Sequence, residues 1–297
     1  MINEKNIKTI GTHNGKFHAD DVMATAILRL LLGDIKVTRT RDEDILKKLD
    51  LVYDIALGEF DHHQLNKKIR ENNIPYAACG LIWKEFGARV IQTFNSQLEE
   101  TNISSIFDYV DKNLVQGIDA ADNGMNIKSE IKVTTISDII QSFNPTWDSK
   151  DSKDDAFEEA AQYAAEVLKR IINRQISVIK ARIIVDDAFQ TRTMNEIMIL
   201  KIGCPWLQHL LKIDVNSEVL FVISPGDRNG DYKIQAVKKA VDSFETRKDL
   251  LETIRGKSSE EINSIIKIKD AIFCHKAGFI ASTKSMESAL KIAKLSI

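Results

Sequence analysis

The sequence predicts an α/β protein with two domains: an amino-terminal domain with a doubly wound, mainly parallel sheet, and a smaller, mixed α+β carboxyl-terminal domain. Strand-like and helix-like segments alternate in the first half, which is typical of a parallel sheet covered by helices. The 297 residues exceed the size at which one hydrophobic core usually stops growing. We therefore expect domains at residues 1–150 and 183–297, joined by a long helix over 151–182.

The elements of the first domain follow from local patterns. An apolar helical segment stops at Gly33, which favours a helix end. The expected order is a strand at 8–10, a helix at 22–32, a strand at 35–38, a short charged helix at 42–48 and a strand at 51–55. Ligands of such sheets bind beyond the carboxyl ends of the strands, so residues that follow these strands are candidates for a site.

The second half has a different character. Apolar residues recur at steps of three and four from Phe157 to Ile179, which predicts one long amphipathic helix. Four strands are expected after it, at 197–200, 219–223, 232–237 and 271–274, with a turn at Gly226–Asp231 making a hairpin of the middle pair. Helices are expected to begin near Ser258 and Ser285.

Three short clusters in the first half place four of the six histidines beside acidic residues, at 13–21, 61–63 and 119–124. Imidazole and carboxylate ligands together suit Mn²⁺, with Mg²⁺, Fe²⁺ or Zn²⁺ as competitors. No cysteine lies in these clusters, which argues against a structural zinc site. Each cluster alone is more often a solvated loop or helix face. Their joint position at strand ends, with Asp54 closing an apolar strand, favours a metal site.

Composition excludes several classes of protein. Lys plus Arg (41) nearly balances Asp plus Glu (43), so global charge does not indicate a nucleic-acid binder. The cysteines Cys79, Cys204 and Cys274 are odd in number and far apart, as in proteins of a reducing compartment. The amino terminus lacks the apolar core of a signal peptide, and the apolar stretches are interrupted by charges. We expect a cytoplasmic protein with no membrane-spanning segment.

The chain resembles the melanocyte proliferating gene family of metal-dependent hydrolases, which is similar to the DHH phosphoesterases. The resemblance spans essentially the whole chain. It is carried by Gly11–Asp21, Phe60–Gln64, Ala78–Phe86, Ile118–Gly124, Trp206, Gln235–Val237, Asp242–Lys248 and His275–Ile280. The chain departs from the family pattern at Asn14 and at Ala281–Ser282.

The resemblance implies a site for two divalent cations, Mn²⁺ before Mg²⁺ or Zn²⁺, in the first domain. The ligands it implies are His13, His18, Asp20, Asp54, His62 and either Asp119 or Asp122, with Asp54 bridging both ions. Asp61 would orient a histidine, and His63 would contact the phosphate or protonate the leaving oxygen. In the second domain Lys238, Arg247, His275 and Lys276 would bind phosphates, and Trp206 would stack on a base.

The function that follows is a two-metal phosphodiesterase, expected to be a 3′ to 5′ exonuclease on RNA or short oligonucleotides. Two alternatives stay open: a small-molecule phosphohydrolase of the pyrophosphatase or cyclic-dinucleotide type, and a nucleic-acid-binding protein whose metal centre is degenerate. The sequence also leaves a homodimer open.

Overall fold

The computed structural model describes residues 2–65, 67–125, 130–226 and 230–297. The chain forms two compact units, Met1–Gln175 and Ile176–Ile297. Helix α7 (Lys153–Gln190) belongs to both, since the boundary between the units falls within it. The helix expected over 151–182 therefore continues to Gln190, and buried residues such as Phe157 and Leu168 form its apolar face.

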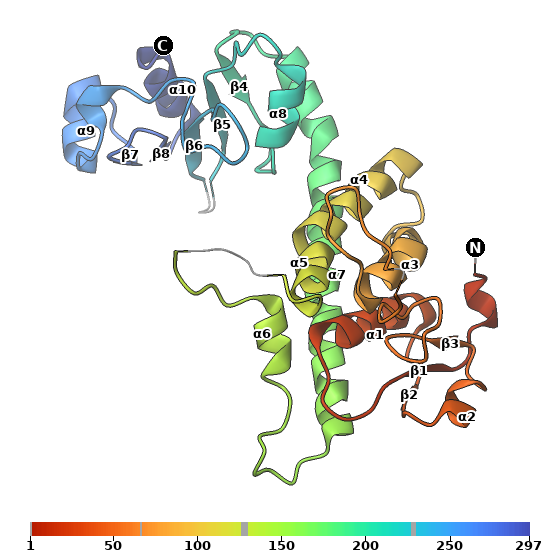
Figure 1. Ribbon diagram of the computed structural model, residues 1–297. Coiled ribbons are helices and arrows are strands. Elements are labelled where there is room, and N and C mark those ends of the chain that lie inside the picture. Colours follow the sequence, from red (N-terminus) through yellow and green to blue (C-terminus); the bar gives the residue numbers. More distant parts are fainter. Residues whose placement is uncertain (1, 66, 126–129, 227–229) are drawn as a thin grey trace. The chain divides into compact units, whose positions relative to one another are not determined.

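A small parallel sheet organises the first unit (Figure 1). Strand β1 (Ile10–Thr12) lies between β2 (Val37–Arg39) and β3 (Leu51–Val52), and Ile10 is in register with both neighbours. The parallel pairing expected from the alternation of strands and helices is confirmed. All three strands run the same way, so the loops that follow them lie at one edge.

Helices pack around this sheet and provide most of the core of the first unit. They are α1 (Ala19–Leu32), α2 (Glu43–Leu46), α3 (Ala78–Phe94), α4 (Glu100–Val110), α5 (Gln116–Asp122) and α6 (Ile136–Gln141), with a 3₁₀ turn η1 at Glu4–Asn6. Between α4 and α5 the helix continues as one π-helical turn, η2 (Asp111–Val115). Helix α1 packs along α3, and each of the two helices buries most of its apolar residues.

The second unit contains a mixed five-stranded sheet in the order β4-β5-β6-β8-β7 (Figure 1). The strands are β4 (Ile197–Ile199), β5 (Phe221–Pro225), β6 (Tyr232–Ala236), β7 (Ala271–Cys274) and β8 (Ile280–Thr283). Its helices are α8 (Leu207–Ile213), α9 (Ser259–Ile266) and α10 (Met286–Leu295), with a 3₁₀ turn η3 at Glu252–Ile254. The predicted β5–β6 hairpin is confirmed by antiparallel pairing. Residues 227–229 of its predicted turn lie outside the described residues.

Side chains on β5 alternate between two cores, as the two-residue period of a strand requires. Phe221 and Ile223 join one buried cluster, while Val222 joins the other together with Val185 of α7. Both faces of the sheet are therefore covered. Within the described parts of the chain, every helix is too short or too polar to span a bilayer.

Candidate metal centre

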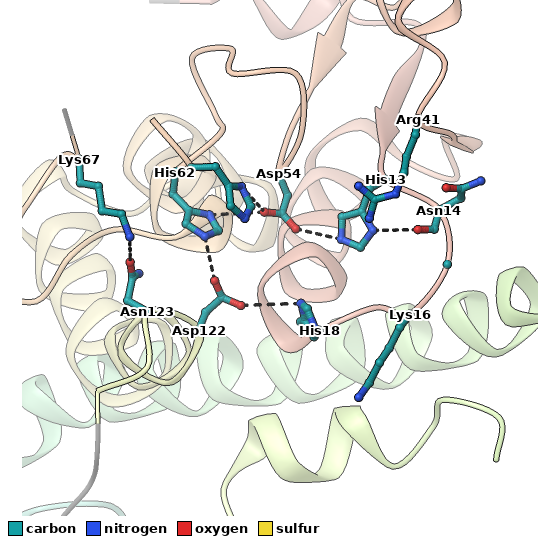
Figure 2. Close-up of a pocket in the computed structure, with 12 residues that line it drawn as sticks. His13, Asn14, Lys16, His18, Arg41, Asp54, His62, Lys67, Asp122 and Asn123 are labelled. Atoms are coloured by element: carbon teal, nitrogen blue, oxygen red, sulfur yellow. Dashed lines mark hydrogen bonds and ion pairs between the residues drawn. The ribbon is translucent and has the colours of Figure 1, made fainter. Parts of the chain in front are cut away.

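The three sequence clusters converge at the carboxyl edge of the parallel sheet (Figure 2). His13 follows β1, Asp54 follows β3, and the first turn of α1 supplies an aspartate pair. The loop after β3 adds two histidines, and the end of α5 adds one more carboxylate. Segments more than 100 residues apart in sequence therefore meet in one site.

Asp54 lies at the centre of the arrangement. Its Oδ2 is 3.2 Å from His13 Nε2, and its Oδ1 is 3.4 Å from His62 Nδ1. The carboxylate thus faces one histidine with each oxygen, and its residue is 4% exposed. Its backbone has a φ of 58°, a left-handed conformation that aspartate adopts more readily than most residues.

Asp21 is a site residue that the sequence reasoning missed. Its Oδ2 is 3.4 Å from His13 Nε2, so it forms a group with His13 and Asp54 whose possible ligand atoms lie within 4.8 Å of one another. Its Oδ1 accepts a hydrogen bond from the His18 amide at 2.9 Å, which completes a capping box at the start of α1. The signal was present in the sequence as two adjacent aspartates, the second of them three residues after His18.

A second group consists of His18, Asp20 and Asp122. His18 Nδ1 lies 4.0 Å from Asp122 Oδ1, and Asp122 Oδ2 is 2.9 Å from His62 Nε2. Asp20 is fully buried, and both of its carboxylate oxygens lack a hydrogen-bond partner among the described residues. His62 lies between the two groups, with its Nδ1 3.8 Å from Asp20 Oδ2.

Asp119 and Asp122, which the sequence left as alternatives, occupy different environments. Asp122 lies in one of the groups that could hold a metal ion, whereas Asp119 lies outside all three groups. Asp119 accepts the Gly80 amide at 2.9 Å and lies 2.7 Å from the guanidinium of Arg70, so it caps the first turn of α3. A Cβ on Gly80 would lie 1.9 Å from the Asp119 carboxylate, so only glycine permits this approach.

Asp61 and His63 form a pair at the mouth of the site. The carboxylate of Asp61 is 2.7 Å from His63 Nδ1 and accepts the amides of Leu57 and His63. These bonds lower the pKa of Asp61 in spite of its burial, so it remains ionised. The His63 ring stacks on His62 and is more than half exposed. Asp61 also forms a third group of possible ligands with Asp54, His62 and His63.

The electrostatics of the site fit a bound cation. Burial raises the pKa of Asp20 well above its ordinary value and that of Asp21 to about 7, and the nearby charge of Asp54 adds to both effects. The buried oxygens of Asp20, Asp54 Oδ1 and His62 Nδ1 have no hydrogen-bond partner in the described structure. Several buried carboxylates with unpartnered oxygens, beside imidazole nitrogens, are the donor set of a divalent metal.

An open cavity of about 700 Å³ adjoins these ligands. Asp54, Asp122 and the histidines line it together with Asn14, Gly15, Asn123 and three cations, Lys16, Arg41 and Lys67. Figure 2 shows the three cations on separate segments around the cavity. The sequence reasoning did not select them, because lysine and arginine are common in surface loops and only the fold places these three at one cavity.

The second unit places its predicted substrate residues differently. Trp206 is a core residue, 8% exposed, and packs in the second buried cluster of the unit, a position less favourable for the expected stacking on a base. The guanidinium of Arg247, which the sequence suggested as a phosphate ligand, binds Asp214 and the Val219 carbonyl within its own unit. Lys238 lies over the Phe244 ring, while His275 and Lys276 lie in the β7–β8 turn.

Residues 9–297 match the model of MYG1_exonuc, an uncharacterised protein family (UPF0160). The MYG1 exonuclease of Bos taurus is 33% identical, with 97% of this chain and 84% of that protein covered. The MYG1 exonuclease of Homo sapiens is 32% identical over 97% of this chain and 85% of its own length. The MYG1 protein of Saccharomyces cerevisiae is 29% identical, with 100% of this chain and 97% of that protein covered.

A crystal structure of RecJ in complex with Mn²⁺ from Thermus thermophilus aligns with a TM-score of 0.27 and 11% identity. The alignment covers 98% of this chain and 52% of RecJ, so the chain spans about half the length of that protein. A likeness at this level establishes nothing about the ligands of this chain. The family match and the relatives do establish kinship: the chain belongs to the MYG1_exonuc family.

Proposed function

We propose that this protein is a metal-dependent phosphodiesterase that removes nucleotides from RNA or short oligonucleotides in the 3′ to 5′ direction, in the cytoplasm. The observation that carries the proposal is Asp54, whose two oxygens face ligand groups on either side. A carboxylate in that position is suited to bridge two cations, and Mn²⁺ matches its mixed nitrogen and oxygen donors.

The donor set divides into two sites that share Asp54. His13 and Asp21 would complete one site, while Asp20, His62 and Asp122 would complete the other, with His18 at its edge. Bound divalent cations supply Lewis-acid polarisation of a phosphoryl oxygen and lower the pKa of a coordinated water. Burial of the aspartates keeps bulk water from competing for these positions.

Asp61 and His63 would handle the proton of the leaving group. Asp61 fixes the ring through Nδ1, which leaves Nε2 as the free nitrogen of a half-exposed imidazole. The cavity that His63 lines also contains the ligand side chains, so Nε2 can reach a substrate bound there. An imidazole held in this way by a carboxylate is suited to donate a proton to a departing oxygen.

The relatives and the charge distribution support a polynucleotide substrate. Two mammalian relatives bear the name exonuclease. The first unit contains 22 Lys and Arg against 28 Asp and Glu, whereas the second contains 19 against 15. The near-neutral total therefore conceals a basic second unit, and a basic surface attracts polyanions. His275 and Lys276 in the β7–β8 turn are the best remaining candidates for phosphate contacts.

A substrate panel tests the proposal. The purified protein is incubated with Mn²⁺ and with end-labelled RNA, the matching DNA, pyrophosphate and a cyclic dinucleotide. We expect stepwise shortening of the RNA from its 3′ end, with release of nucleoside monophosphates and complete loss of turnover in EDTA. Turnover of pyrophosphate or the cyclic dinucleotide alone would establish a small-molecule phosphohydrolase. Metal binding without any turnover would establish a binding protein.

A further inference from the structure

A second cavity adjoins the metal centre within the first unit. It has a volume of about 350 Å³ and shares two lining residues, His18 and Asp122, with the larger cavity. Their side chains are 4.0 Å apart, so this pair lies where the two cavities meet. Asp20, one of the metal-ligand candidates, also lines the smaller cavity. A group held at the metal centre therefore has space on two sides.

The two cavities differ in charge. The larger is lined by Lys16, Arg41 and Lys67. Among the described residues neither the Lys16 nor the Arg41 side chain has an ion-pair partner, so both cations are available to a ligand. Lys67 donates a hydrogen bond to Asn123 at 2.9 Å, which holds it at the cavity wall.

The smaller cavity has a carboxylate in place of these cations. Its described lining includes no lysine or arginine, and Asp138 lies at its wall. Asp138 accepts both the amide and the hydroxyl of Thr135 through Oδ2, and these bonds lower its pKa, so it carries a negative charge at neutral pH. A phosphate placed beside Asp138 would meet like charge.

The remaining lining suits an uncharged sugar and base. Ala19, Ile118 and Ala121 provide an apolar wall, while Ser137 and Gln141 provide hydrogen-bonding groups. Carboxylates accept hydrogen bonds from ribose hydroxyls in other nucleotide sites, and the free oxygen of Asp138 can act in the same way. The volume, about 350 Å³, is within the range of sites that hold one small ligand such as a nucleoside.

We infer that the oligonucleotide binds across the metal centre with its chain running in one direction. The smaller cavity receives the terminal nucleoside with its free hydroxyl, and Lys16 and Arg41 bind the next phosphate of the chain in the larger cavity. This inference rests on the proposed phosphodiesterase function and adds to it a recognition of the unphosphorylated chain end. For a 3′ to 5′ enzyme, that end is the 3′ hydroxyl, so Asp138 acts as a specificity residue that rejects a 3′ phosphate.

Three RNA dinucleotides test the inference: one with no terminal phosphate, one with a 5′ phosphate and one with a 3′ phosphate. Affinity is measured by calorimetry with Ca²⁺ in place of Mn²⁺, and turnover is measured with Mn²⁺. We expect the 5′ phosphate to tighten binding and the 3′ phosphate to weaken it, each on the order of fivefold, the effect of one unit charge at about 4 Å in water.

Matched variants assign the two effects. Arg41→Gln with Lys16→Gln should remove the gain from the 5′ phosphate, while Lys36→Gln, a lysine outside both cavities, should preserve it. Asp138→Asn retains an acceptor for Thr135 and should remove the penalty of the 3′ phosphate; Asp34→Asn is its control. Gln141→Lys leaves the hydrogen bonds between Thr135 and Asp138 intact and places a cation in the smaller cavity, so the 3′ phosphate should then tighten binding.

The outcomes separate this inference from the proposed function. Equal affinities of the wild-type protein for all three dinucleotides would overturn the inference, whether or not turnover occurs. If none of the three dinucleotides is turned over but their affinities follow the expected order, the proposed phosphodiesterase activity is overturned and the proposed direction of the bound chain is supported. If the 3′ phosphate tightens binding and the 5′ phosphate weakens it, the two cavities still distinguish the chain ends, but the chain runs in the opposite direction. That result would overturn the 3′ to 5′ direction.

Discussion

Asp54 shows at the scale of a single residue why the site is difficult to alter. Its side chain must present both oxygens to separate ligand groups, and its backbone must adopt a left-handed conformation at the end of β3. Aspartate and asparagine tolerate this conformation, whereas alanine does so only with strain. Replacement of Asp54 by asparagine therefore changes the ligand chemistry alone, whereas replacement by alanine also strains the backbone.

We expect Asp54→Asn to lower phosphodiesterase activity by at least about a hundredfold, since even the loss of an outer partner of a metal ligand costs roughly 10–100-fold. Its free energy of unfolding should stay within about 1 kcal/mol of wild type, because asparagine accepts the positive φ. Asp54→Ala should lose about 1 kcal/mol more, the cost of a left-handed backbone at a residue with a Cβ. Urea unfolding and a Mn²⁺ titration of activity measure both effects. Wild-type activity of Asp54→Asn at limiting Mn²⁺ would contradict the bridging role.

Asp119 and Asp122 are three residues apart and should respond in opposite ways. Asp119→Asn weakens a buried ion pair with Arg70, so the free energy of unfolding should fall by about 2–3 kcal/mol with little change in metal requirement. Asp122→Asn should raise the metal requirement with little change in stability. Thermal unfolding and metal titration of both variants provide the comparison. A raised metal requirement in Asp119→Asn, at unchanged stability, would place it among the ligands instead.

At the scale of elements, Arg39 of β2 holds the loop between β1 and α1 in place. Its guanidinium donates to the Gly15 carbonyl at 2.9 Å and lies over the Phe157 ring of α7, 4.3 Å from its centroid. It also pairs with Asp154 in the first turn of α7, and its side chain is only 3% exposed. One buried cation therefore joins a strand, the His13–His18 loop and the long helix.

Replacing Arg39 with Met keeps most of the apolar volume but removes the bond to Gly15. We expect the Mn²⁺ concentration for half-maximal activity to rise about tenfold, because the His13–His18 loop loses its anchor, while activity at saturating Mn²⁺ stays near wild type. Arg39→Lys retains the charge without the planar fork and should give an intermediate value. An unchanged metal requirement in both variants would show that the loop holds its conformation without Arg39.

The sequence predicted those elements whose signal is local. The apolar period of α7, the strands around Asp54 and the β5–β6 hairpin are visible in short windows. The general region of the ligands was also visible, because histidine and aspartate clusters followed apparent strands. Burial and pairing were not visible: Trp206 and Arg247 have the chemistry of a substrate contact, but tertiary packing places them in a core and a buried ion pair. Lys16 and Arg41 could not be selected from the sequence, because only the fold brings them to the same cavity.

At the scale of the whole molecule, the second unit has its own polar anchor. Asp214 accepts the amides of Glu218 and Val219 at 3.0 Å and pairs with Arg247 from the segment after β6. Burial alone would raise the pKa of Asp214, but the bond from Arg247 and the two amides outweigh it and lower the pKa. The end of α8, the approach to β5 and the segment after β6 are tied through this carboxylate.

The lowered pKa fixes the sign of a pH dependence. Because the folded pKa lies below the unfolded value of about 3.9, the stabilising contribution of Asp214 is fully present above that pH and is lost as pH falls through the folded pKa. Asp214→Asn should lower the free energy of unfolding by about 2–3 kcal/mol at neutral pH, and this difference should shrink below about pH 4. Urea unfolding of wild type and variant, from neutral pH down through the acid range, measures it. A difference independent of pH would show that the charge of Asp214 contributes nothing.

The π-helical turn at Asp111–Val115 determines where this helix can lose a residue without disturbing the site. It places one more residue between α4 and Asp122 than a regular α-helix would need. An in-frame deletion of a single codon there would restore regular hydrogen bonding and leave Asp119 and Asp122 in nearly the same orientation, because the wide turn already takes up the extra residue. The same deletion in the regular turn between Gln116 and Asp119 would turn both carboxylates by about 100° and shift them by about 1.5 Å. The wide turn is therefore a point in this helix where the chain can shorten by one residue while the α3 cap and the candidate metal ligand keep their places.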